Sequence, residues 1–200
     1  MKLYFVILLI SLSIIITGNI FYVQNIGVSI GNMFLWLLIA ILICGIASAL
    51  ITIFTRIIPS KFFSPLKKRY KVFPKENKLY LKLKIKKWKD KVPELGKLGG
   101  FAKNKIQEPN NSEYIYKFLT ETCIAEFLHG YSIIAGLLVF LILPRIYFWT
   151  LSLPIFILNT ILHVMPLLIQ RYIRPKFLKI YNRLIQLESS DDEENEYSRV

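Results

Sequence analysis

The chain is poor in the residues that build soluble catalytic or metal sites. Only two of its 200 residues are cysteine and only two are histidine. Cys44 and Cys123 are far apart and form no CxxC pair, which argues against a disulfide framework and a structural zinc site. His129 stands near two glutamates, Glu121 and Glu126, but no second histidine follows at helical spacing, as a zinc site on a helix would require. The sequence therefore predicts no metal and no cofactor, and Cys123 is interpreted as a small packing residue rather than a nucleophile.

Acidic residues are also scarce, with 13 Asp and Glu against 26 Lys and Arg, a formal net charge of +13. The excess is concentrated between Arg56 and Lys105, where seventeen basic residues stand beside three acids. Nucleic acid could explain such a stretch. However, a basic loop tethered between apolar runs is explained more simply by anionic lipid and by membrane topology. We therefore expect no nucleic-acid partner.

Charge is almost absent from four long apolar runs, at residues 3–23, 30–55, 130–149 and 152–169. With 54% hydrophobic residues and a mean hydropathy of +0.46, the composition excludes an ordinary soluble domain. The first run is longer than a typical signal-peptide core, so we expect a retained helix. The sequence predicts an all-α, multi-pass protein of the cell membrane with about four spans.

The charge distribution predicts the orientation of these spans. The loop at residues 24–29 carries no charge and suits the outer side, whereas the basic loop suits the cytoplasm, which places both termini in the cytoplasm. Within the basic loop, residues 74–93 alternate as a strand would. A helix with an apolar stripe of Leu81, Ile85, Trp88 and Val92 is favoured, lying in the lipid interface.

Polar side chains flank the hairpin formed by the last two apolar runs. Before it come Glu121, Glu126 and His129, and after it Gln170, Arg171, Tyr172, Arg174 and Lys176. About 40 residues separate the two sets, with Arg145 as the only formal charge, which is enough for two passes at about 20 residues each. Two passes return the chain to its starting side. We therefore expect both sets to meet at the cytoplasmic face, a suitable place for a lipid-linked substrate.

The spacing of these residues suggests roles and leaves alternatives open. On a helix Glu126 and His129 lie about 60° apart, so the carboxylate could orient the imidazole as a base toward a hydroxyl. Alternatively, both are polar residues at headgroup level. Arg171 and Arg174 could grip a phosphate or anchor the helix on the cytoplasmic side. Pro175 could end that helix at Arg174.

Together the motifs resemble a known family. Glu-Thr-x-x-Ala-Glu-x-x-His at 121–129, then the hairpin, then Pro-x-x-x-Gln-Arg-Tyr-x-Arg-Pro at 166–175 is similar to the glycosyl-4,4'-diaponeurosporenoate acyltransferases. Arg-Ile-Ile-Pro at 56–59 and Trp-Lys-Asp-Lys at 88–91 fit the same order, and the likeness covers residues 33–183. The chain departs from the family at Ile173 and His163, where the family has asparagine.

The resemblance implies an activity and a set of roles. These small bacterial membrane enzymes esterify a fatty acyl chain onto the sugar of a glycosylated carotenoid acid. It implies His129 as the base, Glu126 or Glu121 as its orienting group, and Arg171, Arg174 and Lys176 as ligands of the phosphates of the donor. Gln170 and Tyr172 match the same polar motif. The implied partners are membrane lipid, an acyl thioester (acyl-CoA or acyl carrier protein) and a glycosylated carotenoid or related glycolipid acceptor.

We therefore expect three segments: an extra membrane helix and outer turn at 1–29, an acyltransferase-like membrane domain at 30–185, and an acidic disordered tail at 186–200. The competing hypothesis is a non-enzymatic membrane protein that binds a partner or anionic lipid through its basic loop. A transporter is disfavoured because so few polar groups lie within the spans.

Overall fold

The fold is built almost entirely from helices. The computed structural model describes residues 2–92 and 106–197, is 85% helical and contains no strand among these residues. The long helices are α1 (Lys2–Asn25), α2 (Ile30–Ile57), α5 (Ser112–Ala135) and α7 (Leu153–Tyr197). Within the described residues, four helical segments are long and apolar enough to cross a membrane, in agreement with the predicted number of spans. The chain is a membrane protein of all-α class.

Two compact units make up the chain, and each is described by itself. Unit 1 contains residues 1–58, 91–93 and 126–167, and unit 2 contains residues 59–90, 94–125 and 168–200. Helices α5 and α7 each contribute residues to both units.

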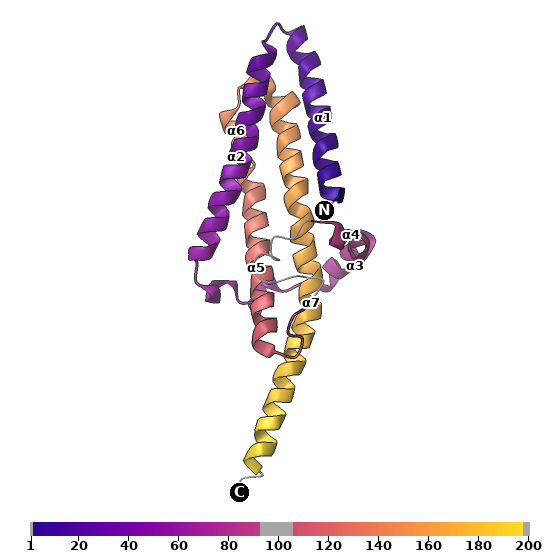
Figure 1. The fold of residues 1–200 in the computed structure, drawn as a ribbon, viewed down its shortest axis with the longest axis vertical. Helices are drawn as coiled ribbons and strands as arrows, with labels where there is room; N and C mark the ends of the chain where they lie inside the picture. Colours follow the sequence, from indigo (N-terminus) through magenta and orange to yellow (C-terminus); the bar gives the residue numbers. More distant parts are fainter. Residues whose placement is uncertain (1, 93–105, 198–200) are drawn as a thin grey trace. The chain divides into compact units, whose positions relative to one another are not determined.

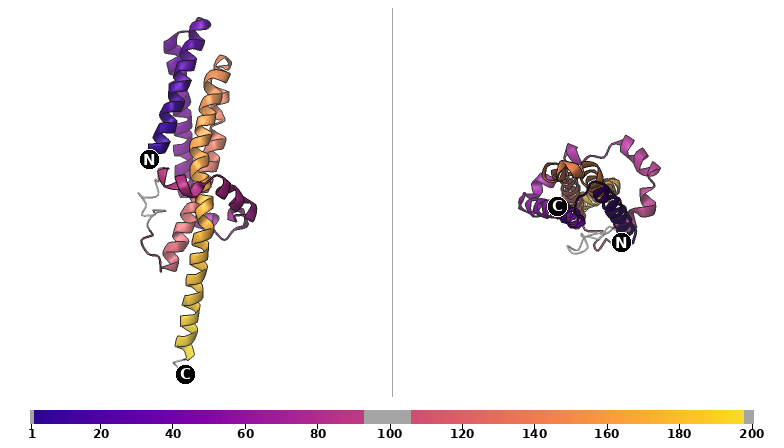
Figure 2. Two further views of the ribbon diagram at one scale, coloured as in Figure 1. Left: turned by 90° about the vertical axis from the view of Figure 1, so that its right-hand side faces the viewer. Right: turned by 90° about the horizontal axis from the view of Figure 1, so that it is seen from above.

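In unit 1, helices α1 and α2 run side by side and are joined by a short turn in which Gly27 adopts a φ of 69° (Figures 1 and 2). That turn requires the left-handed region, which favours glycine. α1 packs on α2, and α2 packs on the short helix α6 (Leu138–Ile142). The core contains Val23, Met33 and Ala40, each 0% exposed. Apolar side chains on the outer faces remain exposed, as expected for surfaces that contact lipid.

The third predicted span, 130–149, is not one continuous helix. α5 ends at Ala135, α6 ends before Pro144, and a 3-10 turn (Arg145–Tyr147) and a π-helical turn (Phe148–Ser152) lead into α7. A methyl group on Gly136 would collide with the amide nitrogen of Asn159, which donates a hydrogen bond to the carbonyl oxygen of Ser132 at 3.1 Å. Close packing at Gly136 and the ring of Pro144 therefore explain the interruptions.

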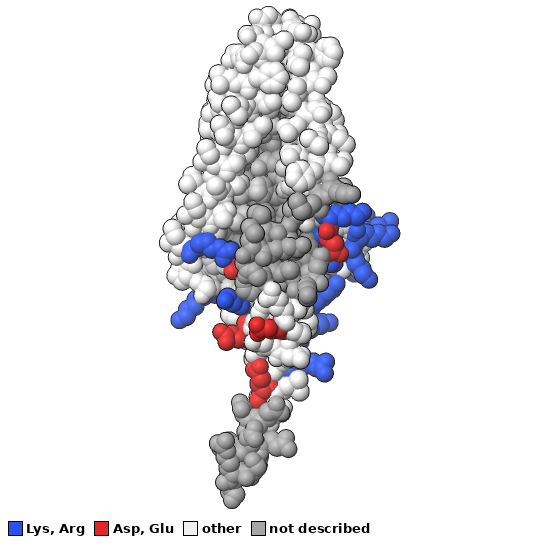
Figure 3. Space-filling model, viewed as in Figure 1, with Lys and Arg blue, Asp and Glu red and all other residues white. Residues whose placement is uncertain are grey.

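In unit 2, the predicted amphipathic helix is broken into α3 (Pro74–Lys82) and α4 (Ile85–Trp88). The break lies at Lys84, which has a φ of 51°, so the apolar stripe expected along 74–93 is interrupted. Ile85 is buried, but Leu81 is 74% exposed and Tyr80 is buried in its place. In the view of Figure 3, Lys and Arg side chains gather over α3 and α4.

Helix α7 is longer than the sequence suggests. It continues through Pro166 and Pro175, so Arg174 is not the end of a helix. The helix also covers residues 186–197 of the segment 186–200 that the sequence predicts as a disordered tail, and residues 198–200 lie outside the described residues. Glutamate, leucine and glutamine are good helix formers, which favours continuation of the helix.

Candidate functional site

In unit 1, the predicted catalytic histidine is paired with the other histidine of the chain. The Nδ1 atoms of His129 on α5 and His163 on α7 lie 3.0 Å apart, and the ring centroids are separated by 5.3 Å. The Nε2 atom of His163 lies 3.4 Å from the hydroxyl oxygen of Ser48 on α2. Both rings are partly buried. Three helices thus bring two imidazoles and a hydroxyl into one hydrogen-bonded row.

The motif spacing does not predict His163 as a partner of His129, because the two histidines are 34 positions apart and only His129 lies in a motif at the end of the hairpin. A signal was nevertheless present, since Asn159 and His163 stand one turn apart inside an apolar run. Polar groups at that depth are costly and usually face a polar group of another helix. Glu126, half-buried and one turn before His129 on α5, remains a candidate for the acidic group near the imidazole.

In unit 2, Arg171 forms a bidentate ion pair with Glu76 of α3. Its Nε and Nη2 atoms donate to the two carboxylate oxygens, each at 2.8 Å, and Nη2 also donates to the carbonyl oxygen of Lys71 at 3.2 Å. The same carboxylate accepts hydrogen bonds from the hydroxyl of Tyr80 at 2.6 Å and from the backbone of Phe73 at 3.1 Å. We call Glu76, Tyr80 and Arg171 the Glu76 cluster. No sequence motif pointed to Glu76.

The Glu76 cluster shifts the acidity of its members. The hydrogen bonds from Arg171 lower the pKa of Glu76 to about 2, outweighing the burial that raises it, and Tyr80 and Phe73 lower it further. Burial, together with the neighbouring carboxylate, raises the pKa of Tyr80 to about 12. At neutral pH the pair is therefore a carboxylate and a guanidinium, with a protonated phenol beside them.

Glu76→Gln is expected to destabilise the protein at pH 7, by about 1 kcal/mol, since the ion pair is only partly buried. Folding lowers the pKa of this carboxyl from 4.5 to about 2. The ion pair therefore stabilises the folded protein fully at pH values above about 4.5, and this stabilisation is lost as the pH falls toward 2. The difference between Glu76→Gln and wild type should therefore shrink between pH 5 and pH 3. Thermal melts of the detergent-solubilised protein measure it. Lys78→Gln, exposed on the same helix, is the control, and a difference independent of pH would contradict the assignment.

Arg174 is held inside unit 2, where it is only 2% exposed. Its Nε and Nη2 atoms donate to the hydroxyl and carbonyl oxygens of Thr122, both at 3.0 Å, and Nη1 donates to the carbonyl oxygen of Tyr70 at 3.1 Å. Thr122 lies in the first predicted motif and Arg174 in the second. The structure therefore joins the two motifs through this side chain, and burial favours a structural role over phosphate binding.

The remaining predicted residues occupy more open positions. Lys176 is exposed, and its Nζ atom lies 2.9 Å from the hydroxyl of Tyr172, whose ring packs edge-on against Tyr80. Gln170 on α7 and Glu121 on α5 are half-buried in unit 2. Whether the two motifs share one membrane face stays a prediction. Within the described residues, no three His, Cys, Asp or Glu side chains are grouped in a way that could hold a metal ion.

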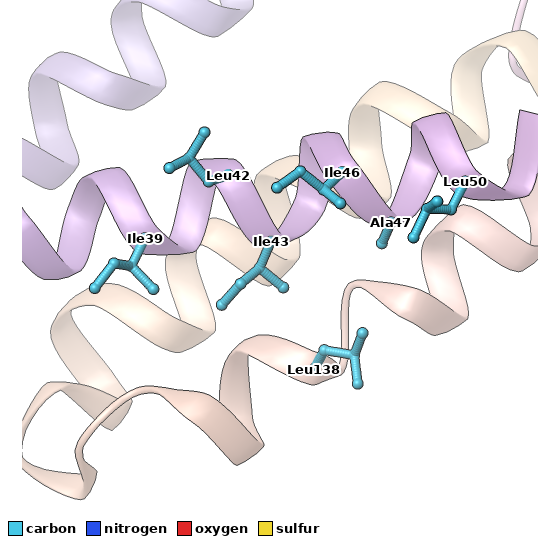
Figure 4. A pocket seen from close by; sticks show the side chains of 7 residues that line it. All are labelled: Ile39, Leu42, Ile43, Ile46, Ala47, Leu50 and Leu138. Atoms are coloured by element: carbon cyan, nitrogen blue, oxygen red, sulfur yellow. The ribbon is translucent and has the colours of Figure 1, made fainter.

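Unit 1 also contains an apolar groove of about 310 Å³. Its lining residues are Ile39, Leu42, Ile43, Ile46, Ala47 and Leu50 of α2 and Leu138 of α6. Figure 4 shows the side chains of Ile39 and Ile43 directed toward the helix that carries Leu138. All seven side chains are hydrocarbon, so the groove resembles the lipid-facing surface and supplies no catalytic group.

The family model described as glycosyl-4,4'-diaponeurosporenoate acyltransferase matches residues 59–183, more than half of the chain. This confirms the resemblance drawn from the motifs, although the match begins later than residue 33. It also favours an enzyme over a non-enzymatic partner-binding protein. No curated protein and no solved structure matches the chain.

Proposed function

Since the chain belongs to the glycosyl-4,4'-diaponeurosporenoate acyltransferase family, we propose that it moves a fatty acyl chain from a thioester donor to a sugar hydroxyl of a glycosyl carotenoid. Its described residues include four apolar helices long enough to span a membrane, so the chain is a membrane acyltransferase of carotenoid biosynthesis. The observation that carries the proposal is the family match, which contains both polar motifs. The domain proposed for this activity is residues 30–185, with residues 1–29 as an added helix and turn.

The proposed chemistry is direct acyl transfer with His129 as the general base. The imidazole takes the proton of the acceptor hydroxyl as its oxygen attacks the thioester carbonyl. The new C–O bond forms, the C–S bond breaks, and the proton held by His129 passes to the departing thiolate. Glu126, one turn earlier on α5, or alternatively Glu121 of the same motif, is proposed to stabilise the imidazolium that forms in between.

The proposed donor site uses the second motif. An acyl-CoA or a phosphopantetheinyl carrier protein presents phosphate, for which Lys176 is exposed and available. Arg171 can contribute by exchanging its carboxylate partner for phosphate, and Gln170 and Tyr172 supply neutral hydrogen-bonding groups nearby in sequence. Arg174 supports this motif from within unit 2.

For the topology we propose that the basic loop, both termini and the site are cytoplasmic, because basic loops between spans stay on that side. A membrane-impermeant maleimide should label Asn25→Cys in intact cells and Lys75→Cys only after the cells are opened. Cys44 and Cys123 would first be replaced by serine. Labelling of Lys75→Cys in intact cells would reverse the assignment.

The test of function is a lipid profile of cells with and without the gene, complemented by the wild type or by variants. We expect one acylated glycosyl carotenoid to disappear without the gene and its unacylated form to accumulate. Membranes supplied with acyl-CoA or with acyl carrier protein then identify the donor. Unchanged lipids in the deletion strain would refute the proposal.

A further inference from the structure

The row of Ser48, His163 and His129 restricts where its protons can lie. All three residues belong to unit 1 and come from α2, α7 and α5. A hydrogen bond between two Nδ1 atoms at 3.0 Å requires that one atom carries the proton and the other offers its lone pair. Each neutral imidazole carries one proton. The pair therefore has two arrangements, in which the rings hold opposite tautomers.

In the first arrangement, His129 Nδ1–H donates to His163 Nδ1, and His163 Nε2–H faces the Ser48 oxygen. The Nε2 atom of His129 then carries a lone pair. In the second, His163 Nδ1–H donates to His129, the Ser48 hydroxyl donates to His163 Nε2, and His129 Nε2 carries the proton. Only the first arrangement leaves His129 able to accept a proton at Nε2.

Building on the proposed function, we propose that His163 is a positioning residue. Its Nδ1 atom accepts the hydrogen bond from His129 Nδ1–H and so keeps the Nε2 atom of His129 free to act as a base, while the Ser48 oxygen accepts the hydrogen bond from His163 Nε2–H. The orienting group at Nδ1 is thus an imidazole rather than the carboxylate that the sequence suggested. A neutral acceptor performs this task inside an apolar span without adding a charge, which would be costly there.

The hydrogen bond between the two imidazoles also stabilises the imidazolium form of His129. When His129 takes a proton from the acceptor hydroxyl, its Nδ1–H becomes a stronger donor, and the lone pair of His163 stabilises the imidazolium. The proton leaves with the thiolate, and the row returns to its starting state. His163 gains and loses no proton overall, so it acts through His129 and is not itself a catalytic residue.

Two variants separate positioning from packing. His163→Leu keeps a side chain of moderate size but has no acceptor, so kcat is expected to fall about 10- to 100-fold while both Michaelis constants stay within about twofold. His163→Asn places an amide oxygen where Nδ1 stands and should recover most of that loss. Ile161→Leu is the control, since the side chain of Ile161 is 41% exposed on the same helix as His163.

A second measurement does not depend on activity. Because the chain has only two histidines, ¹⁵N-histidine labelling gives the signals of two imidazoles alone. Solid-state NMR of the wild type, with the His129 signals assigned by comparison with His163→Asn, should show the His129 ring protonated at Nδ1 and the His163 ring protonated at Nε2; the reverse assignment would overturn the inference. In His163→Asn, the remaining ring should be protonated at Nδ1.

The outcomes are distinguishable. If both rings carry their proton at Nε2, or if His163→Leu keeps the wild-type kcat, the positioning role is wrong. If His163→Asn recovers nothing, His163 serves packing only, which also overturns the inference. An inactive His129→Ala beside an active His163→Leu would refute the inference alone, whereas an active His129→Ala would refute the proposed chemistry.

Discussion

Replacing His129 by alanine is expected to lower acyl transfer by a factor of about 100 to 10,000, the range that a positioned general base contributes. Without His129, no positioned base would accept the proton of the acceptor hydroxyl, which would have to pass to water. Donor binding should change little, because the proposed phosphate contacts come from the second motif. The measurement is initial rates of transfer in isolated membranes at saturating donor.

The control for this prediction is Tyr131→Phe on the same helix, whose ring packs against Phe127 with centroids 4.2 Å apart and whose side chain is half exposed. Its rate should match wild type. The folded amount of each variant, measured by size-exclusion chromatography in detergent, separates loss of chemistry from loss of protein. Full transfer by a well-folded His129→Ala would remove His129 from the mechanism.

Replacing Arg174 by methionine is expected to cost about 2–4 kcal/mol of stability, because hydrogen bonds to a charged group contribute about 1.5–3 kcal/mol each and are not additive. Without the guanidinium, the hydroxyl of Thr122 and the carbonyl of Tyr70 lose a buried donor. The melting temperature should fall by about 5–15 °C. Thermal melts in detergent measure this shift.

Lys179→Met, at an exposed position five residues later on α7, is the matched control and should melt within about 2 °C of wild type. Arg174→Lys should recover little, since an ammonium group cannot reproduce the three-way geometry of the guanidinium. A phosphate-binding role predicts the opposite pattern: an unchanged melting temperature and a raised Michaelis constant for the donor.

The number of spans and the helical class could be predicted from the sequence because apolar, uncharged runs of about 20 residues are stable chiefly as membrane-spanning helices. The motifs at 121–129 and 166–175 also identified the family. The pairings inside the structure were not visible in this way. Glu76 lies 95 positions from Arg171 and belongs to no motif, so only the fold brings its carboxylate to the guanidinium.

The His129–His163 pair was missed for a different reason. A run of hydrophobicity locates a helix in the membrane but does not say which neighbour a polar side chain meets. The break at Lys84 was equally hidden, since a lysine with positive φ has no signature in composition.

The hydrogen bond from Asn159 to the carbonyl of Ser132 has a consequence for biogenesis. Its two partners are 27 positions apart, on helices α7 and α5, so α5 leaves the ribosome before its partner exists. Alone in lipid, α7 would expose the unpaired amide of Asn159, whereas the carbonyl of Ser132 would keep its hydrogen bond from the backbone N–H of Gly136. The two helices are therefore expected to enter the bilayer as a pair, with α5 waiting at the insertion machinery until α7 is synthesised.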